Sequence, residues 1–352
     1  AAPAAANAPV PKETAPSAPR QRLFNLNIRY VYNSIPKNLV HMDYWFPYPP
    51  AGSHQSLHNL VVNSAYAMNQ DSDPETGNIF MHMEGGARGG VPMQVSFRMD
   101  VERREIRNES PAPSGQPPGE EELKALRDRW LAPERMTPVT REVRSRASKA
   151  TSGRRRPLDK ARAIYEYVIE NVVPIDNVSE VRGAGYGNLE FVLRELKGDA
   201  VDMAAAFVGL CRAEGIPART VMGMKIPTGI KTGKITGYHG WAEFYIEGIG
   251  WLPADPFEGA RHEARRGYYF GSLDENRVAV SIGRDIKLKP APKQETPLNF
   301  FINPYWEGDG REMPIPFVDV EFQELDRIPD PVMIPATESD APPQQTPVPP
   351  PR

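Results

Sequence analysis

Apolar and polar residues alternate along the first third of the chain. The clearest case is residues 23–30, where apolar side chains take every second position and Asn or Arg lies between most of them. Successive side chains of a strand point to opposite faces, so this alternation predicts a strand with one buried face. Further strand-like runs, separated by Gly, Pro, Asn and Asp, cover residues 40–46, 57–62, 78–83 and 93–101. Short strands with such turn residues between them predict an antiparallel β-domain over residues 21–107.

Further along the chain the apolar spacing becomes helical. The helical spacing of Leu123, Leu126 and Trp130 predicts one short helix. Pro157 suits the first turn of a helix that would cover residues 157–171. The remaining predicted elements are helices near residues 188–196 and 199–214 and strands at 219–225, 238–247, 250–254 and 278–282. A block of helices followed by antiparallel strands is the order of an α+β fold, not of a βαβ fold.

Proline separates these regions. The 352 residues include 38 prolines, which is too many for a compact globule throughout. The two proline-rich ends are predicted to be extended arms, because they lack the apolar surface that would offset the entropy lost on ordering. The predicted order is an arm (1–20), an antiparallel β-domain (21–107), a Pro/Gly/Ser linker (108–119), an α+β domain (120–312), a terminal strand (313–326) and a Pro-rich tail (327–352).

Charge, hydropathy and cysteine content exclude several classes of protein. The formal net charge is −3 at pH 7, which favours neither nucleic acid nor an anionic membrane surface as a partner. No run of 18 apolar residues occurs, so no transmembrane segment is expected. The single cysteine, Cys211, cannot form an intrachain disulfide. The Ala/Pro-rich start resembles the mature side of a signal-peptidase site, so we expect an exported bacterial protein, periplasmic or extracellular; a trimmed chain is the alternative.

Four short motifs follow one another in the second half of the chain. They are Gly198-Asp199-Ala200-Val201-Asp202, Arg212-Ala213-Glu214-Gly215-Ile216-Pro217-Ala218-Arg219, His239-Gly240-Trp241 and Gly250-Trp251-Leu252-Pro253-Ala254-Asp255. In this order they resemble the core of the bacterial transglutaminase-like superfamily, whose pattern is G-x-C-x-D, R-x-x-G-I-P-A-R, H-x-W and G-W-x-x-x-D. The resemblance implies a papain-like α+β domain after the β-domain. Flanking segments at 185–188 and 269–285 extend the resemblance, and with the β-domain included it covers roughly residues 22–305.

The resemblance also implies a catalytic role for three positions. In the family, a cysteine at the start of a helix is the nucleophile, because a helix N-terminus stabilises a thiolate. A histidine takes the thiol proton, and an aspartate orients that histidine. His239 and Asp255 match the last two positions, whereas Ala200 stands in place of the cysteine. Alanine cannot attack a carbonyl, so this chain cannot carry out acyl transfer by the family mechanism.

Three further residues are expected around this site. Trp241 lies two residues after His239, so it points to the same face of the strand and is expected to wall the site. Tyr186 stands where many family members have the Trp of a G-W-G-[ND] segment. Asp202 is expected to be a helix-start or hydrogen-bonding residue, not an acid or base.

We expect neither a substitute nucleophile nor a cofactor. Cys211 lies eleven residues after Ala200, about three helical turns away, so it is predicted to be a buried core cysteine. His54 and His58 have no matching carboxylate or thiol cluster, so no metal is expected. No phosphate-binding loop, nicotinamide fingerprint or haem-attachment motif occurs.

Two explanations account for Ala200: natural loss of the cysteine, which we favour, or its replacement by an experimenter. Natural loss predicts a catalytically inactive, structural or accessory subunit of an envelope complex, whose extended arms lie over protein partners. A membrane energy-converting complex is one candidate host. Replacement predicts an inactivated secreted cysteine amidase, peptidase or transglutaminase. A third hypothesis is a pseudoenzyme that binds a peptide without cutting it.

Overall fold

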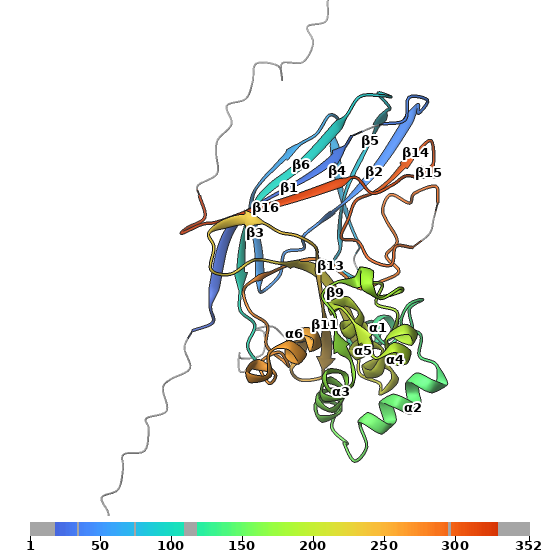
Figure 1. Cartoon of the computed structure of the whole chain (residues 1–352), viewed down its shortest axis with the longest axis vertical. Coiled ribbons are helices and arrows are strands. Elements are labelled where there is room, and N and C mark those ends of the chain that lie inside the picture. The colour runs from blue at the N-terminus through green and yellow to red at the C-terminus, as the bar shows by residue number, and fades with distance from the viewer. Residues whose placement is uncertain (1–17, 34, 74, 109–117, 295–296, 330–352) are drawn as a thin grey trace, which may run out of the picture.

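The computed structural model describes residues 18–33, 35–73, 75–108, 118–294 and 297–329. A β-sandwich lies against a mixed body of helices and strands (Figure 1), and the predicted α+β fold class is confirmed. Most of the predicted arms and of the predicted linker lies outside the described residues. Within the described ranges, no helix is both long and apolar enough to span a bilayer.

The β-sandwich consists of two five-stranded antiparallel sheets. One sheet has the order β10 (Thr232–Lys234), β16 (Phe317–Glu324), β1 (Gln21–Tyr32), β6 (Met93–Arg104) and β3 (Gln55–Asn63). The other has the order β15 (Arg311–Glu312), β14 (Tyr305–Gly308), β2 (His41–Tyr48), β5 (Ile79–Gly86) and β4 (Met68–Ser72). In β1, every second residue from Phe24 onward is buried, as its alternation predicts. These side chains meet apolar residues of β2 and β6 in one core.

Strands from both ends of the chain complete the sandwich. β16 pairs with β1 over eight residues on each strand, and β14 pairs with β2, with Tyr305 opposite Trp45. The sequence-based division assigned residues 120–312 to the α+β domain, but the structure places β14 and β15 in the sandwich. Pairing between segments so far apart leaves no local signal in the sequence, since it depends on tertiary register.

A buried helix, α5 (Ala200–Ala213), forms the centre of the mixed body. Every residue from Ala200 to Arg212 is buried, because the helix is apolar on all sides and is covered by other helices and a sheet. The covering sheet has the order β12 (Gly250–Ala254), β11 (His239–Ile246), β9 (Ala218–Lys225) and β13 (Arg277–Ile282). The other elements are α1 (Glu120–Trp130), α2 (Arg141–Ala150), α3 (Pro157–Asn171), β7 (Val173–Pro174), η1 (Val178–Glu180), α4 (Leu189–Glu195), β8 (Lys197–Gly198), α6 (Pro256–Arg261) and η2 (Glu263–Arg265).

The elements that the sequence did not predict include the helices α2 and α6 and the strand β4. Only Val143 and Ala147 of α2 are buried, so its apolar face is too narrow to produce a clear helical pattern. α6 follows β12 at once and is capped by Asp255, a residue that the motif reading assigned to the site alone. Nearly all of β4 is exposed and polar, so it shows no alternation.

The two bodies share apolar surface. Met224 and Ile226 at the end of β9, and Val278 and Val280 of β13, belong to the same buried cluster as the sandwich core. The sheet that carries His239 is therefore anchored in the sandwich and not merely tethered to it (Figure 1).

Candidate functional site

Ala200 is the first residue of α5. The Asp199 carboxylate accepts a hydrogen bond from the Asp202 backbone N–H at 2.9 Å, and the Asp202 carboxylate accepts one from the Asp199 N–H at 3.2 Å. This reciprocal capping box fixes the start of the helix, where the helix dipole is positive. The side chain at position 200 is a methyl group, and the residue is 6% exposed. The position that the motif resemblance assigns to the nucleophile therefore holds none.

Asp202 holds the loop before α4 against the start of α5. Its fully buried carboxylate accepts hydrogen bonds from the backbone N–H groups of Gly185 and Gly187, each at 2.7 Å. The structure thus places Asp202 beneath the loop that carries Tyr186, as a hydrogen-bonding residue that fixes the helix start. It does not line the cavity described below.

The carboxylates of Asp199 and Asp202 lie close together in a buried setting. Burial, followed by the charge of Asp202, raises the pKa of Asp199 from 3.8 to about 6. Burial also raises the pKa of Asp202. The start of α5 is therefore a place where negative charge is costly, in spite of the favourable helix dipole.

His239 and Asp255 meet at the edge of the covering sheet. His239 begins β11, Asp255 follows β12, and these strands are neighbours, with Ala242 opposite Ala254. His239 Nε2 lies 2.7 Å from Asp255 Oδ2, and both residues are buried. The other carboxylate oxygen accepts a hydrogen bond from the Glu258 N–H at 3.0 Å. Both oxygens of Asp255 are thus in use, which fixes the orientation of the imidazole.

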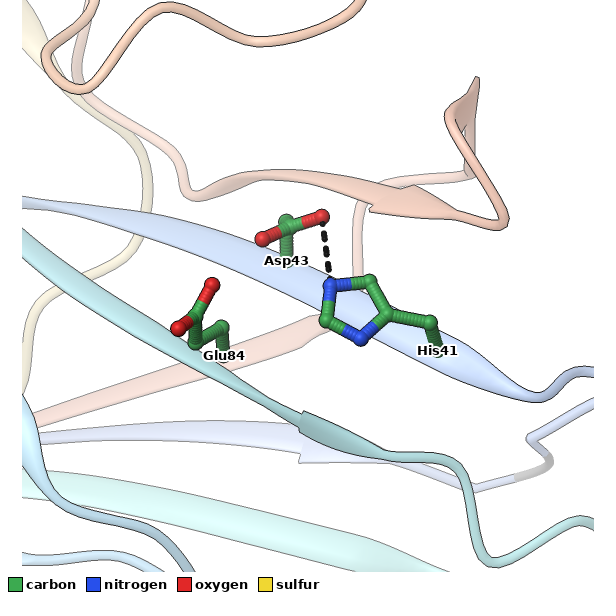
Figure 2. Close-up of side chains that lie close together, drawn as sticks. All are labelled: His41, Asp43 and Glu84. Carbon is green, nitrogen blue, oxygen red and sulfur yellow. Dashed lines mark ion pairs between the residues drawn. The ribbon is translucent and has the colours of Figure 1, made fainter.

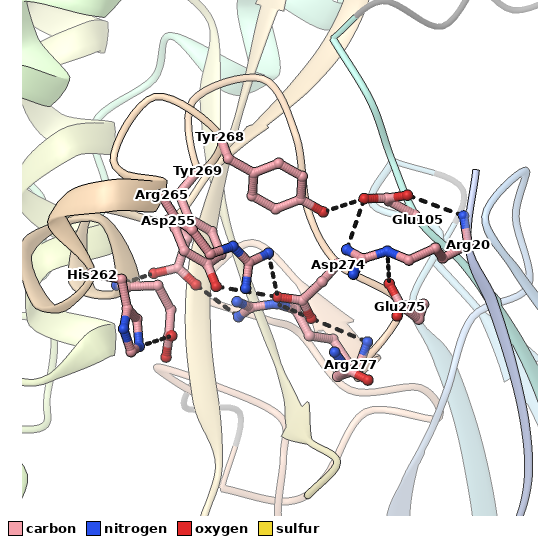
Figure 3. A network of polar contacts seen from close by, with 12 residues as sticks. Arg20, Glu105, Asp255, His262, Arg265, Tyr268, Tyr269, Asp274, Glu275 and Arg277 are labelled. Carbon is pink, nitrogen blue, oxygen red and sulfur yellow. Dashed lines mark hydrogen bonds and ion pairs between the residues drawn. The ribbon is translucent and has the colours of Figure 1, made fainter. Parts of the chain in front are cut away.

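Arg277 is a member of this site to which the sequence analysis gave no role. It lies on β13 and is fully buried; Nη1 is 2.7 Å from Asp255 Oδ2, and Nε is 3.5 Å from Asp274 Oδ1 (Figure 3). Burial opposes ionisation of Asp255, but the charges of His239 and Arg277 outweigh it and hold its pKa below the ordinary value. Asp255 therefore stays ionised while it holds His239.

The start of the helix and the start of the strand touch at Gly240. A Cβ atom added to Gly240 would lie 3.0 Å from Val201 Cγ2 and 3.1 Å from Val201 Cα. These distances are shorter than most contacts of real Cβ atoms, so a side chain here would require helix and strand to shift apart. Ala200 and His239 each precede one of the two contacting residues, so they flank the same junction. The structure therefore brings together the two motifs that the sequence analysis assigned to one site.

A cavity of about 300 Å³ lies beside His239. Its lining combines aromatic, charged and small polar residues: Asp176, Lys225, Thr236, Gly237, Tyr238, Phe257, Glu258, Arg261 and His262. Lys225 Nζ lies 2.6 Å from Glu258 Oε1, and Arg261 forms an ion pair with Asp176. The cavity is thus a polar pocket with an aromatic wall, and its charges are already paired.

Trp241 and Tyr186 were both expected to wall the site. Trp241 is 1% exposed and packs with Val221 and Leu273, and its ring lies roughly parallel to His239 at a centroid distance of 6.5 Å. Trp241 therefore supports His239 from within the protein. Tyr186 is 59% exposed, and its carbonyl accepts hydrogen bonds from the Asn299 side-chain amide at 2.9 Å and from the Arg284 guanidinium at 3.4 Å. Neither residue is among those that line the cavity.

Comparison with known proteins identifies the fold of this region. Residues 144–256 match the family model of the transglutaminase-like superfamily. The chain contains a transglutaminase-like domain. The resemblance inferred from the motifs is therefore confirmed, and His239 and Asp255 lie within the matched segment.

The relatives found are distant. An uncharacterized protein of Haemophilus influenzae is 32% identical over 186 residues, which is 44% of this chain and 49% of the relative. The chain thus spans about half the length of this curated relative. A crystal structure of a candidate cysteine protease from Cytophaga hutchinsonii is 16% identical, with a TM-score of 0.58 over 89% of this chain and 93% of that one. It supports the fold alone. The periplasmic domain of TgpA from Pseudomonas aeruginosa is 16% identical, covering 66% of this chain and 88% of that domain, with a TM-score of 0.34.

The other sequence candidates lie away from the site. Cys211 is fully buried in α5, and burial raises the pKa of its thiol well above the ordinary value. His58 faces Glu102 on the sandwich at 4.0 Å, and the His54 carbonyl accepts a hydrogen bond from Arg103. The transglutaminase-like domain therefore has an oriented histidine and a capped helix start that begins with an alanine.

Proposed function

We propose that this chain is a catalytically inactive transglutaminase-like protein that acts by binding protein partners, as an accessory subunit of an exported or membrane-attached assembly. The observation that carries the proposal is the methyl group of Ala200 at the start of α5, beside an assembled His239–Asp255 pair. A methyl group has no lone pair, so no acyl intermediate can form there. An oriented histidine without a nucleophile has no proton to remove.

Neither the Cys211 thiol nor the Asp199 carboxylate takes the place of the cysteine. The Cys211 thiol is fully buried and its raised pKa keeps it protonated, whereas attack requires an accessible thiolate. The Asp199 carboxylate accepts a hydrogen bond from the backbone of α5 as its cap. Using it as a nucleophile would uncap the most buried helix of the domain.

The cavity beside His239 is the part of the domain that would bind a partner. Tyr238 and Phe257 provide aromatic surface there, with charged groups around them. Recognition sites commonly combine apolar surface with a few fixed polar groups. Tyr238 is 49% exposed and lies next to His239, so a partner segment entering the cavity would contact it.

Isolation of the tagged chain from membranes of its source organism under native conditions tests this proposal. We expect the wild-type chain to migrate as part of a complex well above its own mass of 39.2 kDa. Tyr238→Arg should release it, because a longer charged side chain fills the mouth of the cavity. Val40→Arg is the matched control: Val40 is 75% exposed on the sandwich, so this change should leave the complex intact. A wild-type chain that runs alone near its own mass would contradict the proposal.

The intact His239–Asp255 pair favours a second candidate, an acyl-transfer enzyme whose cysteine has been replaced. Ala200→Cys separates the two, since Cys211 is fully buried and the wild-type chain should not react with iodoacetamide. Rapid labelling of Ala200→Cys near neutral pH that is lost on a further His239→Ala change would favour the enzyme. Slow labelling that is indifferent to His239 would favour the binding protein.

A further inference from the structure

A cluster of side chains that could bind a metal lies on the β-sandwich, on the other body of the molecule from His239. His41 and Asp43 are two residues apart on β2 and therefore share a face, and Glu84 lies directly opposite Asp43 on β5. One potential ligand atom from each of the three lies within 4.8 Å of the others (Figure 2). His41 Nε2 is 3.0 Å from Asp43 Oδ2. The sheet register thus gathers one imidazole and two carboxylates at one point.

His82 adds an independent observation. It lies two residues before Glu84 on β5, on the same face, and is only 6% exposed. Its Nε2 atom has no hydrogen-bond partner in the part of the chain that the structure describes, and it lies 3.6 Å from Asp43 Oδ1. A buried polar atom without a hydrogen-bond partner destabilises the fold unless a bound ligand, ion or water provides that partner. The Asp43 carboxylate is thus approached by two imidazoles, one at each oxygen.

The cluster carries uncompensated negative charge. Asp43 and Glu84 are directly opposite each other on neighbouring strands, and like charges in that position destabilise a sheet. Within the described ranges, the ion pairs of Asp43 are with His41 and His82, and neither carboxylate pairs with a lysine or arginine. A bound cation would remove the repulsion between the two carboxylates.

A third carboxylate near this point has another task. Glu307 on β14 lies opposite Asp43 on the other side of β2. Its oxygens accept hydrogen bonds from the backbone N–H groups of Lys293 and Gln294, at 3.0 and 2.9 Å, and it is fully buried. Glu307 therefore holds a loop over the sheet and is not available as a ligand.

We propose that His41, Asp43 and Glu84 bind a divalent transition-metal ion of the Zn²⁺ class, and that His82 positions Asp43 through Oδ1. An imidazole with two carboxylates suits Zn²⁺, whereas Ca²⁺ and Mg²⁺ take oxygen ligands. The side chain of His41 is 43% exposed, so an ion can enter from solvent. Three protein ligands leave a fourth position for water. Carboxylates that bind a metal are themselves hydrogen-bonded by neighbouring groups, and His82 Nε2, 3.6 Å from Asp43 Oδ1, is placed to supply such a bond.

Calorimetric titration of the full chain with Zn²⁺, together with visible absorption after titration with Co²⁺, tests the site. We expect one ion per chain, tetrahedral Co²⁺ absorption bands, and a rise in Tm on adding Zn²⁺. Glu84→Gln should lower the Zn²⁺ affinity strongly and remove the rise in Tm. Because Glu84 is exposed, this variant should fold normally. His82→Phe should lower the affinity by about 10–100-fold, as expected for a positioning residue.

His58→Ala is the matched control. His58 is also a half-exposed histidine beside a carboxylate on the sandwich, but it belongs to β3 on the other sheet. Its removal should leave the Zn²⁺ affinity unchanged. The proposal is overturned if the wild-type chain binds no Zn²⁺ or Co²⁺ at one per chain, if Glu84→Gln binds as tightly as wild type, or if His58→Ala weakens binding equally.

Discussion

The two sides of the candidate site differ in what they hold. At the start of α5 a neutral methyl group sits between two carboxylates whose pKa values are raised. At the edge of the sheet, Asp255 and Arg277 are fully buried and 2.7 Å apart, with His239 on the same carboxylate. One side tolerates the loss of a functional group, because an alanine there leaves nothing unpaired. The other side does not, because each buried charge depends on its partner.

This difference affects how strongly the motif residue Asp255 supports an active parent enzyme. Asp255 binds Arg277, caps α6 and holds His239, so the fold needs it whether or not the site performs chemistry. Its presence is therefore weaker support for an active parent enzyme than its place in the motif suggests. Natural loss of the cysteine is compatible with an intact Asp255, since the two positions are under separate structural constraints.

Of the changes at the two sides of the site, removing Arg277 should lower the free energy of unfolding most. Arg277→Met leaves the Asp255 carboxylate buried with His239 alone, and breaking a buried ion pair in this way costs about 3–5 kcal/mol. The free energy of unfolding, measured in urea, should fall by that amount. Lys234→Met removes the exposed partner of Asp319 and serves as the control for losing an ion pair; it should have almost no effect.

The double variant Arg277→Met with Asp255→Asn should be more stable than the sum of the two single changes predicts. Once the cation is gone, neutralising Asp255 removes a penalty instead of adding one. Strict additivity of the two changes would show that the pair is not coupled, and would leave the cap of α6 as the structural role of Asp255.

A smaller effect is expected at the junction between the two sides. Gly240→Ala places a Cβ atom 3.1 Å from the Cα of Val201, so the start of α5 and the start of β11 must separate. Overpacking of this kind costs about 1–3 kcal/mol. Gly267→Ala lies in the same body with nothing within 4 Å of the added atom, and should be neutral. Equal unfolding free energies for the two variants would mean that helix and strand are not tightly joined.

Local patterns in the sequence predicted much of this fold. Three patterns each lie within one element: the alternation along β1, the proline at the start of α3 and the apolar run of α5. Each of these elements lies where its pattern indicates. The family resemblance implied that the start of this helix and the strand with His239 form one site, and the structure places Gly240 against Val201. Position 200 at the start of α5 also followed from the sequence, since the helix was expected near 199–214.

What the sequence could not show depends on which strands become neighbours. Arg277 reaches Asp255 only because β13 pairs with β9, two strands away from β12. The proposed metal ligands were missed for the same reason. The expectation of no metal rested on His54 and His58, whereas Glu84 joins His41 only through the register of β5 on β2. Cross-strand partners of this kind are set by tertiary structure.

The two sides of the site should respond to pH in opposite ways, because the pKa of Asp199 is raised and that of Asp255 is lowered. Because the pKa of Asp199 is raised from 3.8 to about 6, its protonated form stabilises the fold below pH 3.8, and this contribution is lost as pH rises through 6. Asp199→Asn mimics the protonated acid and keeps the cap. It should therefore be about 1–3 kcal/mol more stable than wild type at pH 7, with the difference shrinking towards pH 4.

Urea unfolding at pH 4, 5, 6 and 7 measures this difference, with Asp71→Asn on the exposed strand β4 as the control for losing one negative charge. An Asp199→Asn variant that is less stable than wild type at pH 7 would mean that the helix dipole outweighs burial at the start of α5. Asp255 acts in the opposite sense: its pKa is lowered, so its contribution is present above pH 3.8 and is lost only in stronger acid. Of these two sides, only the helix start should therefore change its contribution to stability between pH 4 and 7.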